Sequence, residues 1–274
     1  MDAHGKRRHK LTTMHLAARL VRSGTSLAFG GLLYQNKPVA FVHALVRCEV
    51  GGLHLMPPAA SSYDVDLLVG AGLATAVSCP AVYFEDLGLA PRFRKAAETR
   101  TIAVWEVDEA AMIGGLLATL ANAPYIPICS VDGSQVADES PQIVRIEDGE
   151  GGFWAARPIA PDVAVVHAQY GDVYGNVVHR GATYADVLLA KAARVTIVTV
   201  DEVETERALS SDDGITIPAH FVDAIVEAPE GALPCSSHGC YSADHPRLAE
   251  YVRLAAHDDE FAKYLTTLRD RPLP

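Results

Sequence analysis

The sequence predicts an α/β fold built on an open, mostly parallel sheet that is flanked by helices. Segments 163–167 and 195–200 are almost continuously apolar and rich in β-branched residues, a pattern typical of strands buried on both faces of a parallel sheet. Segment 184–193, which lies between them, has helical periodicity, so the three together predict a strand–helix–strand crossover. Strand-like and helix-like segments alternate along most of the chain, as they do in layered α/β proteins.

Glycine and proline residues mark the ends of the predicted elements in the first half of the chain. Gly24 is suited to the end of a helix, Pro38 to the start of one, and Pro57-Pro58 stop a strand. The predicted order is helix 16–22, strand 26–29, helix 39–47, strand 53–56, helix 64–71, strand 81–84, helix 91–98, strand 102–106 and helix 109–120.

The second half contains the longest irregular segment. Residues 131–152 are polar and rich in glycine, which predicts a long loop or an excursion within the fold. A last strand is expected at 221–226 and a helical stretch at 245–268. We expect one domain over residues 1–274, with the basic residues 1–12 forming a flexible tail.

Composition excludes several classes of protein. The 274 residues carry a formal net charge of −11, whereas a nucleic-acid binder shows a basic stripe and an anionic membrane surface attracts cations. No apolar run approaches the roughly 18–20 residues of a membrane-spanning helix, and the N-terminus has no apolar signal-peptide region. Five scattered cysteines suit thiols in a reducing compartment. We therefore expect a cytoplasmic protein that binds neither nucleic acid nor membrane.

Three predicted strand ends carry residues suited to a site, because ligands of open parallel sheets gather at the carboxyl ends of the strands. Gly30-Gly31 would let a ligand approach backbone N–H groups closely, although such a pair also serves in plain structural turns. Glu85 follows a predicted strand and is either a catalytic carboxylate or an ordinary solvated acid. Asp108 and Glu109 begin a helix, where acids complement the helix dipole without any catalytic role.

Two further groups are weaker candidates. His167 and Asp172 are polar residues after a strongly apolar strand, just before a tight turn. The loop 235–245 contains two cysteines and two histidines, which are zinc ligands by type, but their spacing matches no common zinc motif. We expect a structured loop there and no metal. No dinucleotide-binding or P-loop fingerprint is present.

Several short motifs occur together in an order that points to a known family. They are SG at 23–24 before FGG at 29–31, SSYDVDLL at 61–68 running on to GAG at 70–72, FE at 84–85 with LGLAP at 87–91 and FR at 93–94, PDVA at 161–164 with His167, GD at 171–172 with GN at 175–176, and VDAIVEAP at 222–229 with the loop up to Tyr241. In this order the chain resembles the α subunit of family I CoA-transferases, nearest the glutaconate CoA-transferase group, over about residues 16–265.

The resemblance implies a CoA-transferase fold of the NagB/RpiA-like type and a partner β subunit, in an αβ pair or a tetramer of two such pairs (α₂β₂). It implies acyl-CoA and a carboxylic acid as substrates, with coenzyme A carried between them and no permanently bound cofactor. The resemblance further implies that a β-subunit glutamate attacks the acyl-CoA, forms a mixed anhydride and becomes a glutamyl-CoA thioester, from which an acceptor carboxylate takes the CoA.

The resemblance also assigns roles to residues of this chain. Gly30 and Gly31 would line the substrate cleft and offer N–H groups to developing negative charge. The motif that bears the β-subunit nucleophile is not recognisable, so we expect the chain alone to be inactive and Glu85 to be a cleft residue at most.

Two other functions remain open. A related α subunit belongs to a hydrolase of ring-fused acyl-CoA intermediates in steroid breakdown, whose α-chain glutamate serves as a base at a position that corresponds to Glu109 here. A non-catalytic acyl-CoA-binding subunit would also fit a glycine turn without a nucleophile. The acyl group and the acceptor stay unassigned, since Arg92 and Arg94 are either contacts for a dicarboxylate or solvated helix residues.

Overall fold

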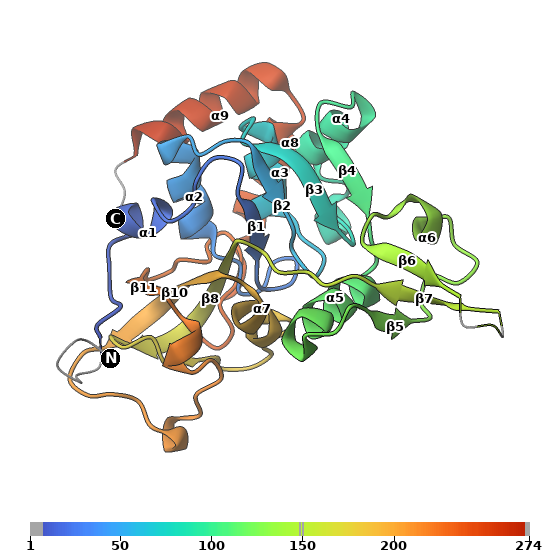
Figure 1. The fold of residues 1–274 in the computed structure, drawn as a ribbon. Helices are drawn as coiled ribbons and strands as arrows, with labels where there is room; N and C mark the ends of the chain where they lie inside the picture. Colours follow the sequence, from blue (N-terminus) through green and yellow to red (C-terminus); the bar gives the residue numbers. More distant parts are fainter. Residues whose placement is uncertain (1–7, 148, 150, 272–274) are drawn as a thin grey trace.

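The computed structural model describes residues 8–147, 149 and 151–271, and its centre is the mostly parallel sheet that the sequence predicts (Figure 1). Eight strands form this sheet within the described residues, in the order β11-β10-β8-β1-β2-β3-β4, with β9 antiparallel to β8. Their bounds are β1 (Ser26–Phe29), β2 (Leu53–Leu55), β3 (Ala74–Cys79), β4 (Ala103–Glu106), β8 (Val163–Asp172), β9 (Val177–Val178), β10 (Val195–Glu204) and β11 (Ala224–Glu227).

Helices cover both faces of the sheet, as Figure 1 shows. One face carries six of the described helices and the other carries α5 and α7. The first set is α1 (Met14–Ala18), α2 (Val39–Cys48), α3 (Tyr63–Gly70), α4 (Pro91–Glu98), α8 (His245–Ala255) and α9 (Asp258–Asp270), and the second is α5 (Glu109–Ala121) and α7 (Asp186–Ala192). The predicted crossover is confirmed, because α7 connects the neighbouring parallel strands β8 and β10.

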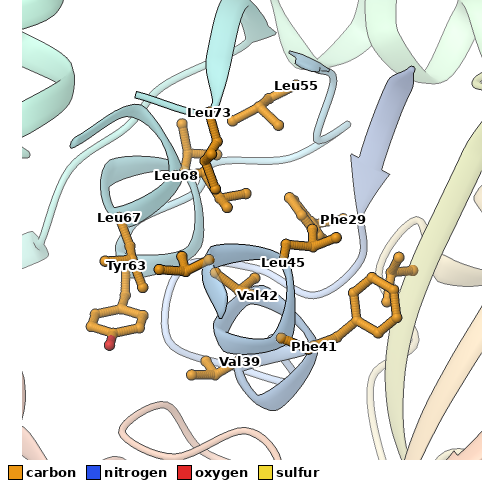
Figure 2. Packing of buried hydrophobic residues seen from close by; sticks show 14 of the residues in the cluster. Phe29, Val39, Phe41, Val42, Leu45, Leu55, Tyr63, Leu67, Leu68 and Leu73 are labelled. Carbon is orange, nitrogen blue, oxygen red and sulfur yellow. The ribbon is translucent and has the colours of Figure 1, made fainter. Parts of the chain in front are cut away.

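The central strands divide their side chains between two hydrophobic clusters. Leu27 and Phe29 point into the cluster under α2 and α3, whereas Ala28 between them faces the cluster under α5 and α7. Because successive side chains of a strand point to opposite faces, this alternation explains why these strands are apolar throughout. Figure 2 shows the Phe29 side chain packed beside Val42 and Leu45 of α2.

A small second sheet interrupts the main fold between α5 and β8. Strands β5 (Ile126–Ile128), β6 (Ile143–Ile146) and β7 (Phe153–Ala156) pair antiparallel in the order β5-β7-β6, and helix α6 (Val136–Glu139) lies between β5 and β6. Figure 1 shows this unit at the side of the molecule next to α5. The polar segment expected at 131–152 therefore belongs to an excursion that has its own strands.

The prediction of a strand at 81–84 is wrong. The strand is Ala74–Cys79, which pairs in parallel with β2 and β4, whereas 81–84 contributes only isolated bridges from Val82 and Tyr83. Small residues fill β3, so its sequence lacks a strong apolar signal, and burial by neighbouring strands decides its conformation. The expected helical stretch at 245–268 divides at Ala256-His257 into α8 and α9.

The N-terminal segment lies partly outside the described residues, since residues 1–7 are not among them. Lys10, in its second half, donates its backbone N–H to Val173 O at 2.7 Å and its ammonium group to Val222 O at 2.6 Å. Leu11 forms a parallel bridge with Ile225. Residues 10–12 are therefore held against the sheet and do not form a flexible tail.

Candidate functional site

The sheet changes its direction of growth between β1 and β8. From β1 the chain adds β2, β3 and β4 on one side, and from β8 it adds β10 and β11 on the other. In open α/β sheets, ligands bind at such a reversal, outside the carboxyl ends of the two central strands. We call this end of β1 and β8 the crevice. Gly30 and Gly31 directly follow β1 at this point, as the sequence predicted.

Only glycine fits at these two positions. A Cβ atom on Gly30 would lie 2.5 Å from Asp186 Oδ1, and one on Gly31 would lie 2.6 Å from Asn36 O and collide with Gln35 O. Gly31 also has a φ of +73°, in the left-handed region that side chains disfavour. The backbone oxygens of Gln35 and Asn36 and the buried Asp186 carboxylate therefore lie so close to the turn that they leave no space for a side chain.

The N–H groups of the glycine turn already have partners within the chain. Gly30 N donates to Val165 O at 2.9 Å, and Gly31 N donates to Asp186 Oδ1 at 2.8 Å. A buried N–H group needs such an acceptor, and each of these donates its single hydrogen here. The expectation that both N–H groups face developing negative charge is therefore not met in this arrangement, although the backbone of the turn still borders the crevice.

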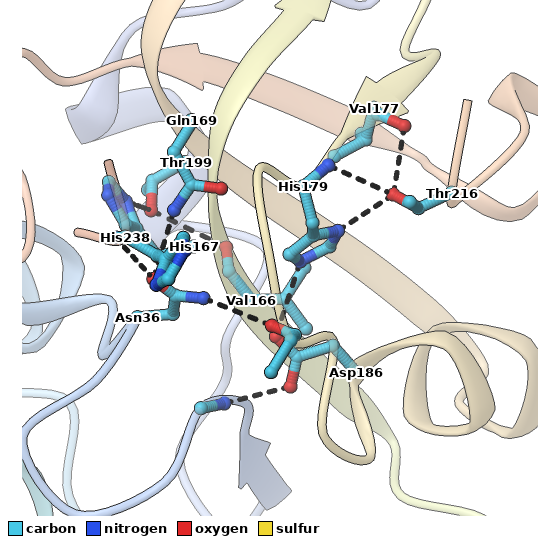
Figure 3. A network of polar contacts seen from close by, with 12 residues as sticks. Asn36, Val166, His167, Gln169, Val177, His179, Asp186, Thr199, Thr216 and His238 are labelled. Carbon is cyan, nitrogen blue, oxygen red and sulfur yellow. Dashed lines mark hydrogen bonds and ion pairs between the residues drawn. The ribbon is translucent and has the colours of Figure 1, made fainter. Parts of the chain in front are cut away.

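Asp186 connects the glycine turn to His179, in the segment that follows β9 (Figure 3). It is the first residue of α7 and is fully buried. Its Oδ2 lies 3.4 Å from His179 Nε2, and His179 Nδ1 is hydrogen-bonded to Thr216 Oγ1 at 2.7 Å. One carboxylate thereby fixes the turn after β1 relative to the segment that follows β9.

Gln169 joins three loops around the same crevice. Its Nε2 donates to Asn36 Oδ1 at 2.9 Å and to Ser237 Oγ at 3.0 Å, and its Oε1 accepts the backbone N–H of Arg180 at 2.7 Å. His238 N adds a bond of 3.2 Å to Asn36 Oδ1. The loops 30–37, 179–186 and 235–241 are consequently held as one surface, on which the Arg180 and His238 side chains are exposed.

Below this surface lies a second polar group centred on Asp201. Asp201 accepts hydrogen bonds from Ser237 Oγ and, at 2.9 Å, from Tyr241 OH, and its Oδ2 lies 3.3 Å from His167 Nε2. Burial acts to raise the pKa of Asp201, but the bonds from His167, Ser237 and Tyr241 outweigh it and lower the pKa. His167 also bonds Thr199 Oγ1 at 3.0 Å and is completely buried.

This arrangement corrects the prediction for His167 and Asp172. β8 continues to Asp172, so His167 lies within the strand, and its contact with Asp201 links it to Ser237 of the loop 235–241. Asp172 accepts the N–H groups of Tyr174 and Asn176, each at 2.9 Å, and stabilises its own hairpin turn. Neither side chain reaches the crevice surface, and both roles are structural.

A buried ion pair supports the chain after the glycine turn. Lys37 Nζ lies 3.1 Å from Asp64 Oδ2 and donates to Ser61 Oγ at 2.9 Å. Both charged side chains are 0% exposed. Lys37 lies just before α2 and Asp64 lies in the first turn of α3, so the pair locks the starts of two helices beside the crevice.

The two candidate glutamates lie in different places. Glu85 does not follow a strand but begins a 3-10 turn, is exposed and has a φ of +46°. Burial, with the charges of Glu85 and Asp86, raises the pKa of Tyr34, which places Glu85 near the loop 30–37. Glu109 is the exposed first residue of α5 and follows β4, three strands from β1 and thus roughly 14 Å across the sheet. Asp108 caps α5 by accepting the Ala111 N–H at 2.8 Å.

The remaining candidates lie outside the crevice or are already paired. Cys235 is buried and Cys240 exposed, His245 Nε2 lies 3.1 Å from Asp86 Oδ1, and within the described ranges no three ligand-type side chains are placed to hold a metal. On α4, Arg92 pairs with Asp258 and Arg94 with Glu98. Among the described helices none is long and apolar enough to cross a membrane.

Comparison with known proteins agrees with this geometry. The model of the coenzyme A transferase family matches residues 11–228. The α subunit of glutaconate CoA-transferase from Acidaminococcus fermentans is 28% identical over 271 residues, covering 92% of this chain and 84% of the relative. The crystal structure of that organism's glutaconate CoA-transferase matches with a TM-score of 0.90 at 27% identity, over 96% of this chain and 89% of that chain.

Two other relatives are named for different activities. The IpdA subunit of the cholesterol ring-cleaving hydrolase of Rhodococcus jostii is 31% identical over 278 residues, covering 95% of this chain and 92% of the relative. The crystal structure of a variant of the decarboxylase AibA/AibB matches with a TM-score of 0.85 at 29% identity, over 97% of this chain and 100% of that chain.

Fold and site together define an open parallel α/β protein whose strand order reverses beside a tightly packed glycine turn. The chain belongs to the coenzyme A transferase family. The sequence identified the glycine turn but not Asp186, Gln169 or Asp201, which hold it and its neighbouring loops. In the sequence, Asp186 stands out only as an acid near the start of a predicted helix. An acid at that position complements the dipole of any helix, so it does not indicate a site.

Proposed function

We propose that this chain is the α subunit of a heteromeric CoA-transferase, which moves CoA between an acyl-CoA and a carboxylic acid. The observation that supports this most strongly is the family match over residues 11–228 together with the TM-score of 0.90 to glutaconate CoA-transferase. The crevice beside Gly30-Gly31 is the expected substrate site.

The internal pairing of the carboxylates favours a nucleophile from the partner chain. Asp64, Asp186 and Asp201 each lie beside the crevice loops, but all three carboxylates accept hydrogen bonds from within this chain. A nucleophilic carboxylate needs an accessible oxygen that faces the thioester carbon. Asp186 Oδ2 accepts no hydrogen bond, but the Asp186 side chain is completely buried. Of the acids near loop 30–37, Glu85 is exposed, and we assign it to the border of the cleft.

In the proposed reaction a β-subunit glutamate attacks the thioester carbonyl and expels CoA thiolate, which leaves a mixed anhydride. The thiolate then attacks the glutamyl carbonyl, so the donor acid departs and a glutamyl-CoA thioester remains. The acceptor carboxylate repeats both steps in reverse, regenerating the glutamate. This chain supplies a rigid wall for these steps, since Asp186 and Gln169 fix the loops that line the crevice.

Arg180 is a candidate contact for the anionic substrates. Its backbone is held by Gln169, while its side chain is exposed on the crevice surface and has no ion pair with any described residue. A guanidinium group binds a carboxylate or phosphate by two parallel hydrogen bonds. We expect Arg180→Ala to raise KM about tenfold with little change in kcat, whereas Arg194→Ala, at an exposed arginine before β10, leaves both constants unchanged.

Co-expression with a candidate β subunit, sought among the neighbouring genes, tests the proposal. The purified complex is incubated with a panel of acyl-CoAs, with and without acetate or a dicarboxylate, and the products are followed by mass spectrometry. CoA on the acceptor acid and a glutamyl-CoA adduct on the partner chain support transfer. A stable complex that binds acyl-CoA but turns nothing over contradicts it and favours a non-catalytic binding subunit.

A ring-opening acyl-CoA hydrolase is the second candidate function. It is favoured by the exposed position of Glu109 at the start of α5, where a base can reach solvent, and by the 31% identity to the IpdA subunit. Free CoA or an opened ring without an acceptor acid would support it. Glu109→Gln then lowers turnover more than about 100-fold, whereas in a transferase it changes turnover by less than about threefold.

The assembly and its location follow from the same proposal. We infer an αβ pair or an α₂β₂ tetramer, which light scattering of the purified complex distinguishes by mass. We place the complex in the cytoplasm, where the CoA pool and a reducing environment suit its substrate and its cysteines. Coenzyme A enters only as a substrate, and no resident cofactor is required by the chemistry.

A further inference from the structure

A cavity lies among the helices that cover one face of the sheet. It has a volume of about 470 Å³, within the range of small-molecule sites, and is bordered by α2, α3, α8 and α9. None of the side chains assigned to the crevice lines it. The lining residues that carry the argument are His43, Tyr63, Arg247, Lys263, Tyr264 and Arg271.

The floor of this cavity is uncharged but offers hydrogen-bonding groups. His43 Nε2 is hydrogen-bonded to Tyr63 OH at 2.8 Å, and Tyr63 OH is hydrogen-bonded in turn to Tyr264 OH. Burial, together with the charges of Arg47, Arg247 and Arg271, lowers the pKa of His43 to about 3, so the imidazole is neutral. Tyr251 and Leu254 add ring and aliphatic surface to the floor and walls.

The rim of the cavity is basic. Arg247, Lys263 and Arg271 are exposed, and none of the three forms an ion pair with a described residue. Of the two acids in the lining, Glu260 is neutralised by Arg253 at 2.8 Å, which leaves Glu250. Three unpaired cations against one unpaired acid make the opening attractive to anions.

We propose that this cavity binds a small organic anion with an aromatic or branched aliphatic body and a carboxylate head. The body fits against Tyr251, Leu254 and the Tyr63–Tyr264 pair, and the head lies at the rim beside Arg247, Lys263 and Arg271. A purely inorganic anion would leave the apolar wall uncovered, and an uncharged body would leave the cations unused.

Two helices that form the floor of the cavity, α2 and α3, also begin at the buried ion pair beside the crevice. His43 belongs to α2, which begins just after the buried Lys37, and Tyr63 belongs to α3, whose Asp64 is the ion partner of Lys37. Tyr63 is therefore adjacent in sequence to one member of the ion pair that holds the starts of α2 and α3. The binding site itself does not depend on which reaction the crevice performs.

Binding of anilinonaphthalene sulfonate to the co-purified complex tests the site, because this probe has an aromatic body and an anionic head that cannot accept CoA. Titration calorimetry gives its Kd, with phenylbutyrate as a competing carboxylate and inorganic phosphate as a bare anion. Arg247→Glu should weaken binding about tenfold, or about 1.4 kcal/mol. Arg269→Glu makes the same change of charge on α9 outside the lining and should leave Kd unchanged.

A cavity-filling variant provides a second, independent readout. Thr267 lines the cavity and is exposed, so Thr267→Trp fills space without disturbing the core and should abolish binding. The proposal is overturned if the complex does not bind the probe, or if both Arg247→Glu and Thr267→Trp bind it as tightly as the unmodified chain. Competition by phosphate at the same concentration as phenylbutyrate would also overturn it, since a site for bare anions needs no apolar wall.

Discussion

Substitution of Gly31 by alanine tests how tightly the glycine turn is built. The left-handed conformation at φ +73° costs an L-residue about 1–2 kcal/mol. The new Cβ would also overlap the backbone oxygens of Gln35 and Asn36, which cannot rotate away, and overpacking of this kind costs about 1–3 kcal/mol. We therefore expect Gly31→Ala to lower the free energy of unfolding by about 2–5 kcal/mol.

Gly24→Ala is the matched control for this substitution. Gly24 has a similar φ of +81°, but a Cβ there would meet no atom within 4 Å, so only the conformational cost of about 1–2 kcal/mol applies. The difference between the two variants isolates the steric part. Each kcal/mol corresponds to roughly 2–4 °C in Tm for a chain of this size.

The assay is thermal and urea unfolding of the two variants in the complex, together with CoA transfer measured below both melting temperatures. We expect the Tm shift of Gly31→Ala to be about 1.5 to 4 times that of Gly24→Ala, with transfer lost only in Gly31→Ala. Equal melting temperatures with full activity in both variants would refute the close packing of this turn and its place beside the substrate.

Two further predictions concern buried charges. Lys37→Met should lower the free energy of unfolding in urea by about 3–5 kcal/mol, because it leaves the Asp64 carboxylate buried without its cation. Adding Asp64→Asn should recover part of that loss. Strictly additive effects of the two substitutions would contradict the pairing. Burial raises the pKa of Asp66 to about 6, against the hydrogen bonds from Phe93 N, Tyr251 OH and Arg92 N. Since the folded pKa exceeds the unfolded value, stability from this group is present below about pH 4 and is lost as the pH rises through about 6. In urea unfolding, the stability of Asp66→Asn relative to the unmodified chain should therefore increase by up to about 2–3 kcal/mol between pH 4 and 7.5. A stability difference that does not change with pH would count against the raised pKa of Asp66.

The sequence was sufficient for the fold class and for the order of most elements. The buried runs of β8 and β10, the helix between them, and the proline and glycine residues around α2 and α4 carry strong local signals. β3 was missed because its small residues become a strand only through pairing with β2 and β4. His167 was misplaced for a similar reason, since its strand continues where the sequence turns polar.

The sequence also indicated where the glycine turn lies, but the tertiary structure determined the hydrogen-bond partners of its N–H groups. Gly30 and Gly31 stand out along the chain by themselves, whereas the acceptor of the Gly31 N–H is Asp186, 155 residues away. The same holds for Gln169, which meets Asn36 and Ser237 only when three loops converge. Local residue preferences determine where strands, helices and turns form, because these depend on neighbours along the chain. Which polar groups are left free for a substrate depends on partners that only the packed sheet brings together.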